Sequence, residues 1–184
     1  MIATANRTTK LCYCALGVVL IAICSWIAIP MTVPFTLQTF GIFAVLRLLG
    51  GRLGTASIVC YLLLGFAGLP VFANFSAGIG VLTGPTGGYL VGFLFMGLLY
   101  WLFEKLLPGK DLVRAAVLLL GLLVLYGFGT MWFILVFLQS GTSMTIGAVL
   151  GMCVLPFVVP DLVKLLLSGL LARRVEQALS RKGT

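Results

Sequence analysis

The sequence predicts an all-α integral membrane protein with six transmembrane helices and both termini in the cytoplasm. Hydrophobic residues make up 61% of the 184 residues and charged residues 9%, and the mean hydropathy is +1.23. These values lie far outside the range of soluble globular domains. A membrane helix needs about 20 apolar residues, so five or six spans fill this length. We therefore expect a single domain over residues 1–184, embedded in the lipid bilayer.

Hydropathy places the spans, and Gly, Pro and charged residues separate them. The N-terminal apolar run is too long for the core of a signal peptide and no small-residue cleavage site follows it, so it is interpreted as the first span. Pro30 and Pro34 interrupt the first connection, GGRLG predicts a tight turn between spans two and three, and PGKD separates spans four and five. The predicted spans lie near 11–29, 35–49, 53–67, 88–107, 115–138 and 144–171.

The basic residues predict the orientation. Every Lys and Arg except Lys164 falls at the span ends on one side, whereas the opposite connections (IPMTVPF, residues 68–88 and QSGTSM) carry no charge. Because cytoplasmic loops hold an excess of Lys and Arg, this side is expected to be cytoplasmic. The net charge of +8 does not indicate nucleic-acid binding, since these residues form no basic stripe. They are Arg7, Lys10, Arg47, Arg52, Lys105, Lys110, Arg114, Arg173, Arg174, Arg181 and Lys182.

Asp161 and Lys164 interrupt an apolar run, LPFVVPDLVKLLLSG. Each charge would cost about 2.5 to 3.5 kcal/mol at the centre of a membrane helix. Asp161 lies roughly 18 Å along a helix from Arg173, which is well inside the hydrocarbon core. Positions i and i+3 share a helix face, and Pro160 suits the first position of a helical segment with Asp161 in its first turn. The pair is either an ion pair that aids insertion or part of a functional site, and the cost of burial favours a site.

The long outer connection, residues 68–87, is uncharged and rich in Gly and apolar residues. This composition predicts a segment that packs against the helices, either as a lid over a cavity or as a plain connector. Asn74 is its one side-chain amide, able to donate and accept hydrogen bonds. Thr36 and Gln38 bring polar groups into the start of the second span, where they could face the same cavity.

No catalytic or metal-binding motif accompanies the pair. The chain has no His, and its five Cys residues lie within apolar segments without disulfide or zinc spacing. GPTGGY lacks the Lys-Ser/Thr of an ATP-binding loop. Neither a cofactor nor an ATPase site is therefore expected. The glycine pairs Gly88/Gly92 and Gly147/Gly151 have the small-xxx-small spacing of close helix crossings.

Four segments have the character of family motifs: VPFTLQTF (33–40), GLPVFA (68–73), GPTGGYLVGF (84–93) and PDLVK (160–164). They resemble the BioY family, the biotin-specific S component of energy-coupling factor (ECF) transporters, and the resemblance extends over nearly the whole chain. It implies a six-helix membrane protein whose biotin pocket opens to the outside. It also implies that Asn74, Asp161 and Lys164 occupy the biotin-contacting positions.

The chemistry of biotin agrees with this implied site. Its ureido ring offers two N–H donors and a carbonyl acceptor, which suit a carboxylate, an ammonium and an amide. The aromatic side chains of Phe72, Phe75 and Tyr89 are expected to cover the thiophane ring and the valeryl chain. Gln38 and Gly84 complete the expected set of substrate-binding residues.

The resemblance also implies partners: a transmembrane coupling subunit (T component) and a pair of cytoplasmic ATPases, in a bacterial plasma membrane. Family members dock on the T component through small residues of the first helix, here within ALGVVLIA. Three alternatives remain. They are an S component for another vitamin, a membrane enzyme using Asp161 as general base with Lys164, and a structural subunit. The lack of a second acid and of metal ligands argues against the enzyme.

Overall fold

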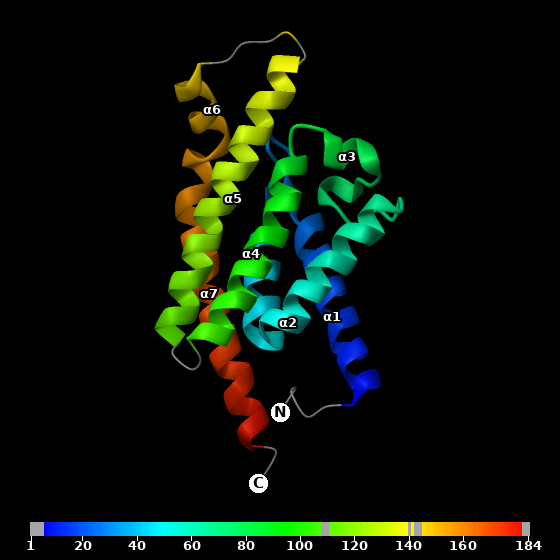
Figure 1. Cartoon of the computed structure of the whole chain (residues 1–184), viewed down its shortest axis with the longest axis vertical. Coiled ribbons are helices and arrows are strands. Elements are labelled where there is room, and N and C mark those ends of the chain that lie inside the picture. Colours follow the sequence, from blue (N-terminus) through cyan, green and yellow to red (C-terminus); the bar gives the residue numbers. More distant parts are fainter. Residues whose placement is uncertain (1–5, 108–110, 140, 142–144, 182–184) are drawn as a thin grey trace.

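The computed structural model describes residues 6–107, 111–139, 141 and 145–181. Lys110, Lys182 and position 144, where the last predicted span begins, lie outside the described residues. The described chain consists of long helices joined by short connections (Figure 1). In chain order the elements are α1 (Arg7–Trp26), β1 (Ala28–Ile29), β2 (Phe35–Thr36), α2 (Gln38–Phe66), η1 (Ala73–Phe75), α3 (Ile79–Thr83), α4 (Gly87–Leu106), α5 (Asp111–Gln139), α6 (Ile146–Cys153) and α7 (Leu155–Arg181).

Five helical segments of the described chain are long and apolar enough to cross a membrane: α1, α2, α4, α5 and the stretch Ile146–Ala178, which comprises α6 and most of α7. Large apolar side chains remain exposed on their outer faces, such as Leu16, Leu123 and Leu166, which are 60–69% exposed. Apolar surface of this extent is unfavourable in water and suits the acyl chains of a bilayer. The chain is therefore a multi-pass membrane protein.

The element α2 is a helical hairpin, because its chain reverses at Gly50. This residue adopts φ 78° and ψ 170°, a backbone conformation that glycine tolerates far better than other residues. The two arms then pair in antiparallel fashion. Gln38 Nε2 donates to the hydroxyl of Tyr61, and a Cβ added at Gly54 would meet Leu46. The predicted spans 35–49 and 53–67 correspond to these arms, and the turn lies within the predicted GGRLG segment.

A contact from α4 stabilises this turn. The N–H of Gly51 donates to Glu104 Oε2 at 2.6 Å, which provides an acceptor for an amide in the first turn of the second arm. A side chain at Gly51 would also collide with the backbone of Trp101. The acidic residue and the small residue together let the turn pack tightly on α4.

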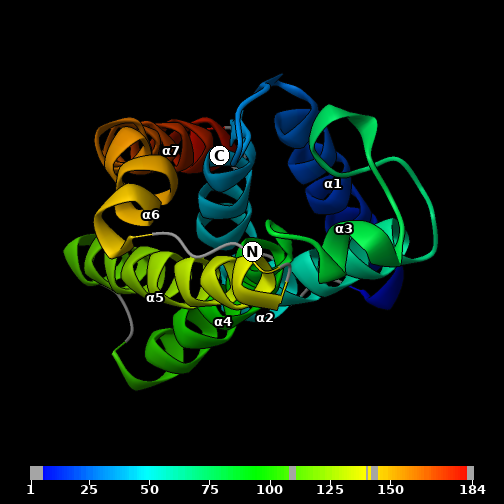
Figure 2. The ribbon, with the colours of Figure 1, turned by 90° about the horizontal axis from the view of Figure 1, so that it is seen from above.

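The helices surround the first arm of α2. Figure 2 shows α6 and α7 on one side and α1 with α3 on the other, with the first arm of α2 (cyan) between them. The start of α1, the α2 turn, the end of α4, the start of α5 and the end of α7 all lie at one end of the molecule (Figure 1). These are the helix ends that carry the basic residues. The uncharged connections that precede α2 and α4 lie at the opposite end.

The opposite end contains a small sheet and the long connection. β1 and β2 pair antiparallel, with Ala28 opposite Thr36. The long connection packs against the helices rather than extending into solvent, because Phe72 is 1% exposed and its ring lies edge-on to Tyr61. Gly65 leaves room for the Phe72 ring, since a Cβ there would overlap it.

The last span is broken between α6 and α7 at Val154, whose φ of −126° departs from helical geometry. This break corrects the interpretation of Pro160, which lies inside α7 rather than at the first helical position. Proline lacks the N–H that would bond to the carbonyl four residues earlier, but a helix that is well packed can pass through it. Asp161 therefore lies in the second turn of α7.

The predicted close helix crossing is confirmed at Gly88 and Gly92. Added Cβ atoms there would meet Trp132 and Leu125 of α5, and α4 and α5 form an extensive helix pair. The expectation is wrong for Gly147 and Gly151, where an added Cβ would meet no described residue within 4 Å. Spacing alone does not determine whether a glycine face finds a neighbouring helix.

Candidate functional site

A cavity of about 210 Å³ lies among the helices at the end opposite the basic residues. The two outer connections, the start of α2, α4, α5, α6 and α7 all contribute side chains to its wall. The wall is mostly apolar with a few polar groups, which is typical of small-molecule sites. Residues of the wall include Thr36, Gln38, Thr39, Phe72, Asn74, Tyr89, Leu90, Phe93, Leu125, Tyr126, Phe157, Asp161 and Lys164.

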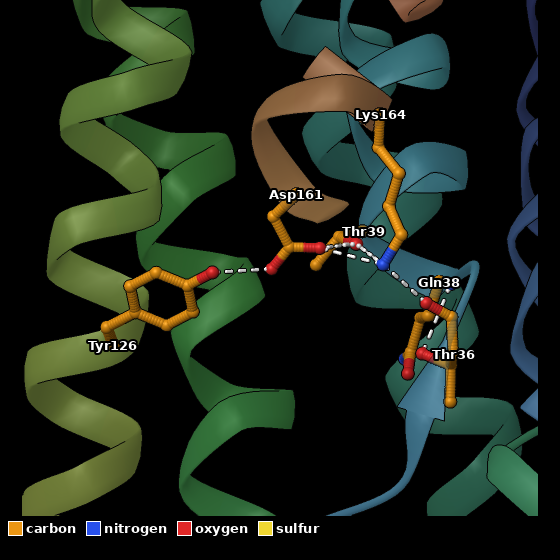
Figure 3. Close-up of polar contacts among 6 residues, drawn as sticks. All are labelled: Thr36, Gln38, Thr39, Tyr126, Asp161 and Lys164. Carbon is orange, nitrogen blue, oxygen red and sulfur yellow. Dashed lines mark hydrogen bonds and ion pairs between the residues drawn. The ribbon is translucent and has the colours of Figure 1, made fainter. Parts of the chain in front are cut away.

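The predicted pair forms a buried salt bridge in this wall. Lys164 Nζ lies 2.7 Å from Asp161 Oδ1, and the two residues are 5% and 2% exposed. Thr39 lies between them, because its hydroxyl donates to Asp161 Oδ1 at 2.8 Å and accepts from Lys164 Nζ at 3.1 Å. Figure 3 shows these three side chains converging from α7 and from the start of α2.

Three further contacts complete the network around the pair. The hydroxyl of Tyr126 donates to the second carboxylate oxygen, Asp161 Oδ2, at 2.7 Å. Lys164 Nζ donates to the carbonyl oxygen of Thr36 at 2.7 Å and lies 4.4 Å from the centre of the Phe35 ring. Several partners thus compensate both charges for the loss of water, as burial at this depth requires.

Gln38 also lines the cavity, at the start of α2. Its amide nitrogen donates to Tyr61 OH at 2.9 Å, and that hydroxyl donates to Ser25 Oγ at 3.1 Å. This chain of hydrogen bonds connects α2 to α1 through buried groups. Gln38 therefore contributes both to the cavity wall and to the packing of the hairpin.

Asn74 reaches the cavity from the long connection, as predicted, whereas Phe75 does not. Both residues adopt left-handed backbone conformations, with φ of 56° and 57°, which is uncommon for Asn and strained for Phe. The resulting bend directs Phe75 away from the cavity, where its ring stacks on Trp26 at 5.1 Å. Trp26 Nε1 in turn donates to the carbonyl of Pro70 at 2.8 Å.

Two more predicted residues differ in their placement. Tyr89 lines the cavity, and its hydroxyl lies 3.2 Å from that of Thr130. Gly84 is not part of the cavity wall; its carbonyl accepts a hydrogen bond from Trp132 Nε1 at 3.0 Å. The GPTGGY segment thus positions the start of α4 rather than presenting Gly84 to a ligand.

Sequence reasoning did not identify Thr39 and Tyr126, the two hydroxyl groups that donate to Asp161. A weak signal existed for each, since Thr39 follows Thr36 and Gln38 and Tyr126 is one of few polar groups in its span. Neither signal indicates that the hydroxyl group bonds to Asp161. Among the described residues, no group of three or more His, Cys, Asp or Glu side chains is arranged to hold a metal ion.

The BioY family model matches residues 1–181 of the chain. The chain belongs to the BioY family. BioY proteins are transporter components rather than enzymes, and this membership excludes the general-base role considered for Asp161.

Individual relatives of this BioY chain agree with the family match. The biotin transporter BioY of Thermotoga maritima is 39% identical over 160 residues, which cover 86% of this chain and 90% of the relative. Biotin transporter BioY2 of Lactococcus lactis subsp. cremoris is 37% identical over 168 residues, or 90% and 89% of the two chains. A crystal structure of the S-component for biotin from an ECF-type ABC transporter superposes with a TM-score of 0.79 at 28% identity, over 93% and 92% of the chains.

Proposed function

We propose that this BioY chain is the substrate-binding S component of an ECF transporter and captures biotin from outside the cell. The observation that carries the proposal is the buried network of Asp161, Lys164 and Thr39 in the wall of the cavity. Two charges buried in a mostly apolar wall are suited to a small ligand whose polar part is compact and neutral.

The ureido ring of biotin has this character. One edge of the ring presents an N–H donor beside the carbonyl acceptor, and a carboxylate beside an ammonium offers the complementary pair. In this arrangement Asp161 accepts from a ureido N–H and Lys164 donates to the carbonyl. A ligand that lacks these groups would exclude water from both charges without offering either of them a hydrogen bond. This cost is a strong basis for selectivity.

The apolar part of biotin fits the remaining wall. Phe72, Phe93 and Phe157 contribute aromatic surface, and Leu90 and Leu125 contribute aliphatic surface. Burial of the thiophane ring and valeryl chain against these side chains supplies about 25 cal/mol per Å² of apolar surface. Asn74, from the long connection, hydrogen-bonds the ligand from that side.

The energy for import comes from partner subunits, a T component and a cytoplasmic ATPase pair, in a bacterial plasma membrane. The exposed face of α1, which includes Leu16, Val19 and Ile23, is the docking surface for the T component. Gly17 and Ala22 of the ALGVVLIA segment are buried inside the chain, so the small-residue docking implied by the resemblance is restricted to Ala15 on this face.

Isothermal titration calorimetry of the purified protein in detergent tests the proposal. We expect saturable binding of biotin that excess thiamine does not compete away. Asp161→Asn should weaken biotin binding at least 100-fold. Asp111→Asn is the matched control, because it makes the same chemical change at an exposed carboxylate that pairs with Arg173 at the other end of the molecule.

Melting temperatures of the variants show whether each is folded. Absence of biotin binding by the wild-type protein would refute the assignment of the ligand. Unchanged binding by a folded Asp161→Asn variant would show that the pair is structural. Competition by thiamine would favour an S component for another vitamin.

A further inference from the structure

We propose that Tyr126 is a positioning residue for substrate binding: its hydroxyl occupies one side of Asp161 Oδ2 and leaves this carboxylate one free acceptor position, which receives a single N–H of the ligand. The inference rests on the proposed function, because it concerns how the same cavity recognises the ureido ring. Tyr126 lies outside the four family motifs, and its role follows from the hydrogen bonds around Asp161.

The carboxylate of Asp161 has a limited capacity to accept hydrogen bonds. Each carboxylate oxygen has two lone-pair positions in the carboxylate plane. Oδ1 already accepts two hydrogen bonds, from Lys164 Nζ at 2.7 Å and from Thr39 Oγ1 at 2.8 Å. Oδ2 accepts from the Tyr126 hydroxyl at 2.7 Å, so one position on Oδ2 remains for a ligand.

The ammonium of Lys164 has three N–H donors. One is used by the carbonyl of Thr36. Asp161 Oδ1 and Thr39 Oγ1 form a nearly equilateral triangle with Nζ, so their directions from Nζ differ by less than the tetrahedral angle between two N–H bonds. These two acceptors therefore share one donor. The remaining N–H is left for the Phe35 ring or for the carbonyl of a ligand.

Tyr126 contacts Asp161 from a different helix. It comes from α5, which packs mainly on α4, whereas Asp161 is on α7. The ion pairs between α5 and α7, such as Asp111 with Arg173, are exposed and lie at the other end of these helices. Beside the cavity, the Tyr126 to Asp161 hydrogen bond connects the two helices (Figure 3). It fixes the rotation of the carboxylate relative to the cavity.

The Tyr126 ring also determines which substitution is informative. It lines the cavity on one side and, on the other, an apolar groove of about 440 Å³ between α5 and α6. Tyr126→Ala would join these two spaces and change the shape of the site. Tyr126→Phe keeps the ring as the wall and removes the hydroxyl alone.

The experiment measures the affinity of biotin and of its two ureido N-methyl derivatives for wild type, Tyr126→Phe and Tyr100→Phe. Tyr100 is the matched control, because its hydroxyl is buried without a hydrogen-bond partner among the described residues and lies away from the cavity. In wild type, methylation of the nitrogen that donates to Asp161 should lower affinity. Tyr126→Phe should bind biotin at least tenfold more weakly than wild type does. It should lose little affinity for the derivative methylated at that nitrogen, so its preference for biotin over this derivative falls at least fivefold.

A purely structural role for the hydroxyl predicts a different result. General loosening of the cavity would weaken biotin and both derivatives by the same factor, and that outcome would overturn the inference. Equal behaviour of Tyr126→Phe and Tyr100→Phe would also overturn it, as would tighter biotin binding by Tyr126→Phe, which would mean that the hydroxyl competes with the ligand.

The same measurements separate this inference from the proposed function. If wild type binds biotin and Asp161→Asn does not, the proposed function stands whatever Tyr126→Phe does. If wild type binds no biotin, both are refuted. Melting temperatures are recorded alongside, and removal of one hydroxyl with the ring retained is expected to leave the protein folded.

Discussion

The hydroxyl of Thr39 lies 2.8 Å from Asp161 Oδ1, across 122 positions of sequence. This bond joins the first turn of α2 to α7, and the same hydroxyl accepts from Lys164. Thr39, in the first turn of α2, is thus hydrogen-bonded to both charged side chains of the pair on α7.

Replacement of Thr39 tests its part in the network. Thr39→Val removes a donor to the carboxylate and an acceptor for the ammonium while preserving the shape of the side chain. Hydrogen bonds to charged groups contribute about 1.5 to 3 kcal/mol, so we expect biotin affinity to fall by roughly 10- to 100-fold. Thr39→Ser should recover most of the affinity. Calorimetry measures both, and a folded Thr39→Val variant that binds biotin as tightly as wild type would show that the hydroxyl has no part in binding.

Joint removal of the two charges separates binding from folding. Asp161→Leu alone leaves the Lys164 ammonium buried and unpaired, which costs about 3 to 5 kcal/mol. The double variant Asp161→Leu/Lys164→Leu leaves no unpaired charge and is expected to melt near the wild-type temperature, yet to bind no detectable biotin. Thermal melting and a binding assay on the same preparations provide the comparison. A double variant that still binds biotin would show that the pair is not part of the binding site.

Trp26 is expected to influence binding through the segment that carries Asn74. Its ring stacks on Phe75, and its indole N–H bonds to Pro70, so it holds the segment in its strained conformation. Trp26→Leu should weaken biotin binding by roughly fivefold, the scale of one aromatic pair. In an Asn74→Ala background the same change should have no further effect. Additive effects in this double-mutant cycle would contradict the positioning role.

The orientation of the chain can be measured on intact cells with a membrane-impermeant maleimide. The five native cysteines of the chain are first replaced. Single cysteines are then introduced at Arg52, beside the α2 turn, and at Thr83, in α3 at the other end; both positions are exposed. Only Thr83→Cys should react from outside. Labelling of Arg52→Cys under these conditions would contradict cytoplasmic termini.

Much of the architecture could be predicted from composition and charge. Apolar runs separated by Gly, Pro and charged residues indicate helices, because unsatisfied backbone groups are too costly in lipid. The basic residues indicate which helix ends lie together, since they favour one side of the membrane. Gly50 and Gly51 mark a tight turn, because few other residues suit that backbone. Local physical chemistry is sufficient for these features.

The centre of the site was also recognisable in the sequence. Asp161 and Lys164 stand out because a charge within an apolar span is costly to bury. Their partners do not stand out in this way. Hydroxyl groups such as those of Thr39 and Tyr126 are common in membrane helices, and each acquires its role from a residue on another helix.

Only the tertiary structure decided which aromatic residues of the long connection face the ligand cavity. Phe72 and Phe75 are the same residue type three positions apart, yet Phe72 lines the cavity and Phe75 stacks on Trp26. The backbone at residues 74 and 75 turns between them. The sequence by itself determined that this chain buries a charged pair within a set of membrane helices. The fold decided which side chains complete the site, because that choice depends on contacts between segments far apart in the chain.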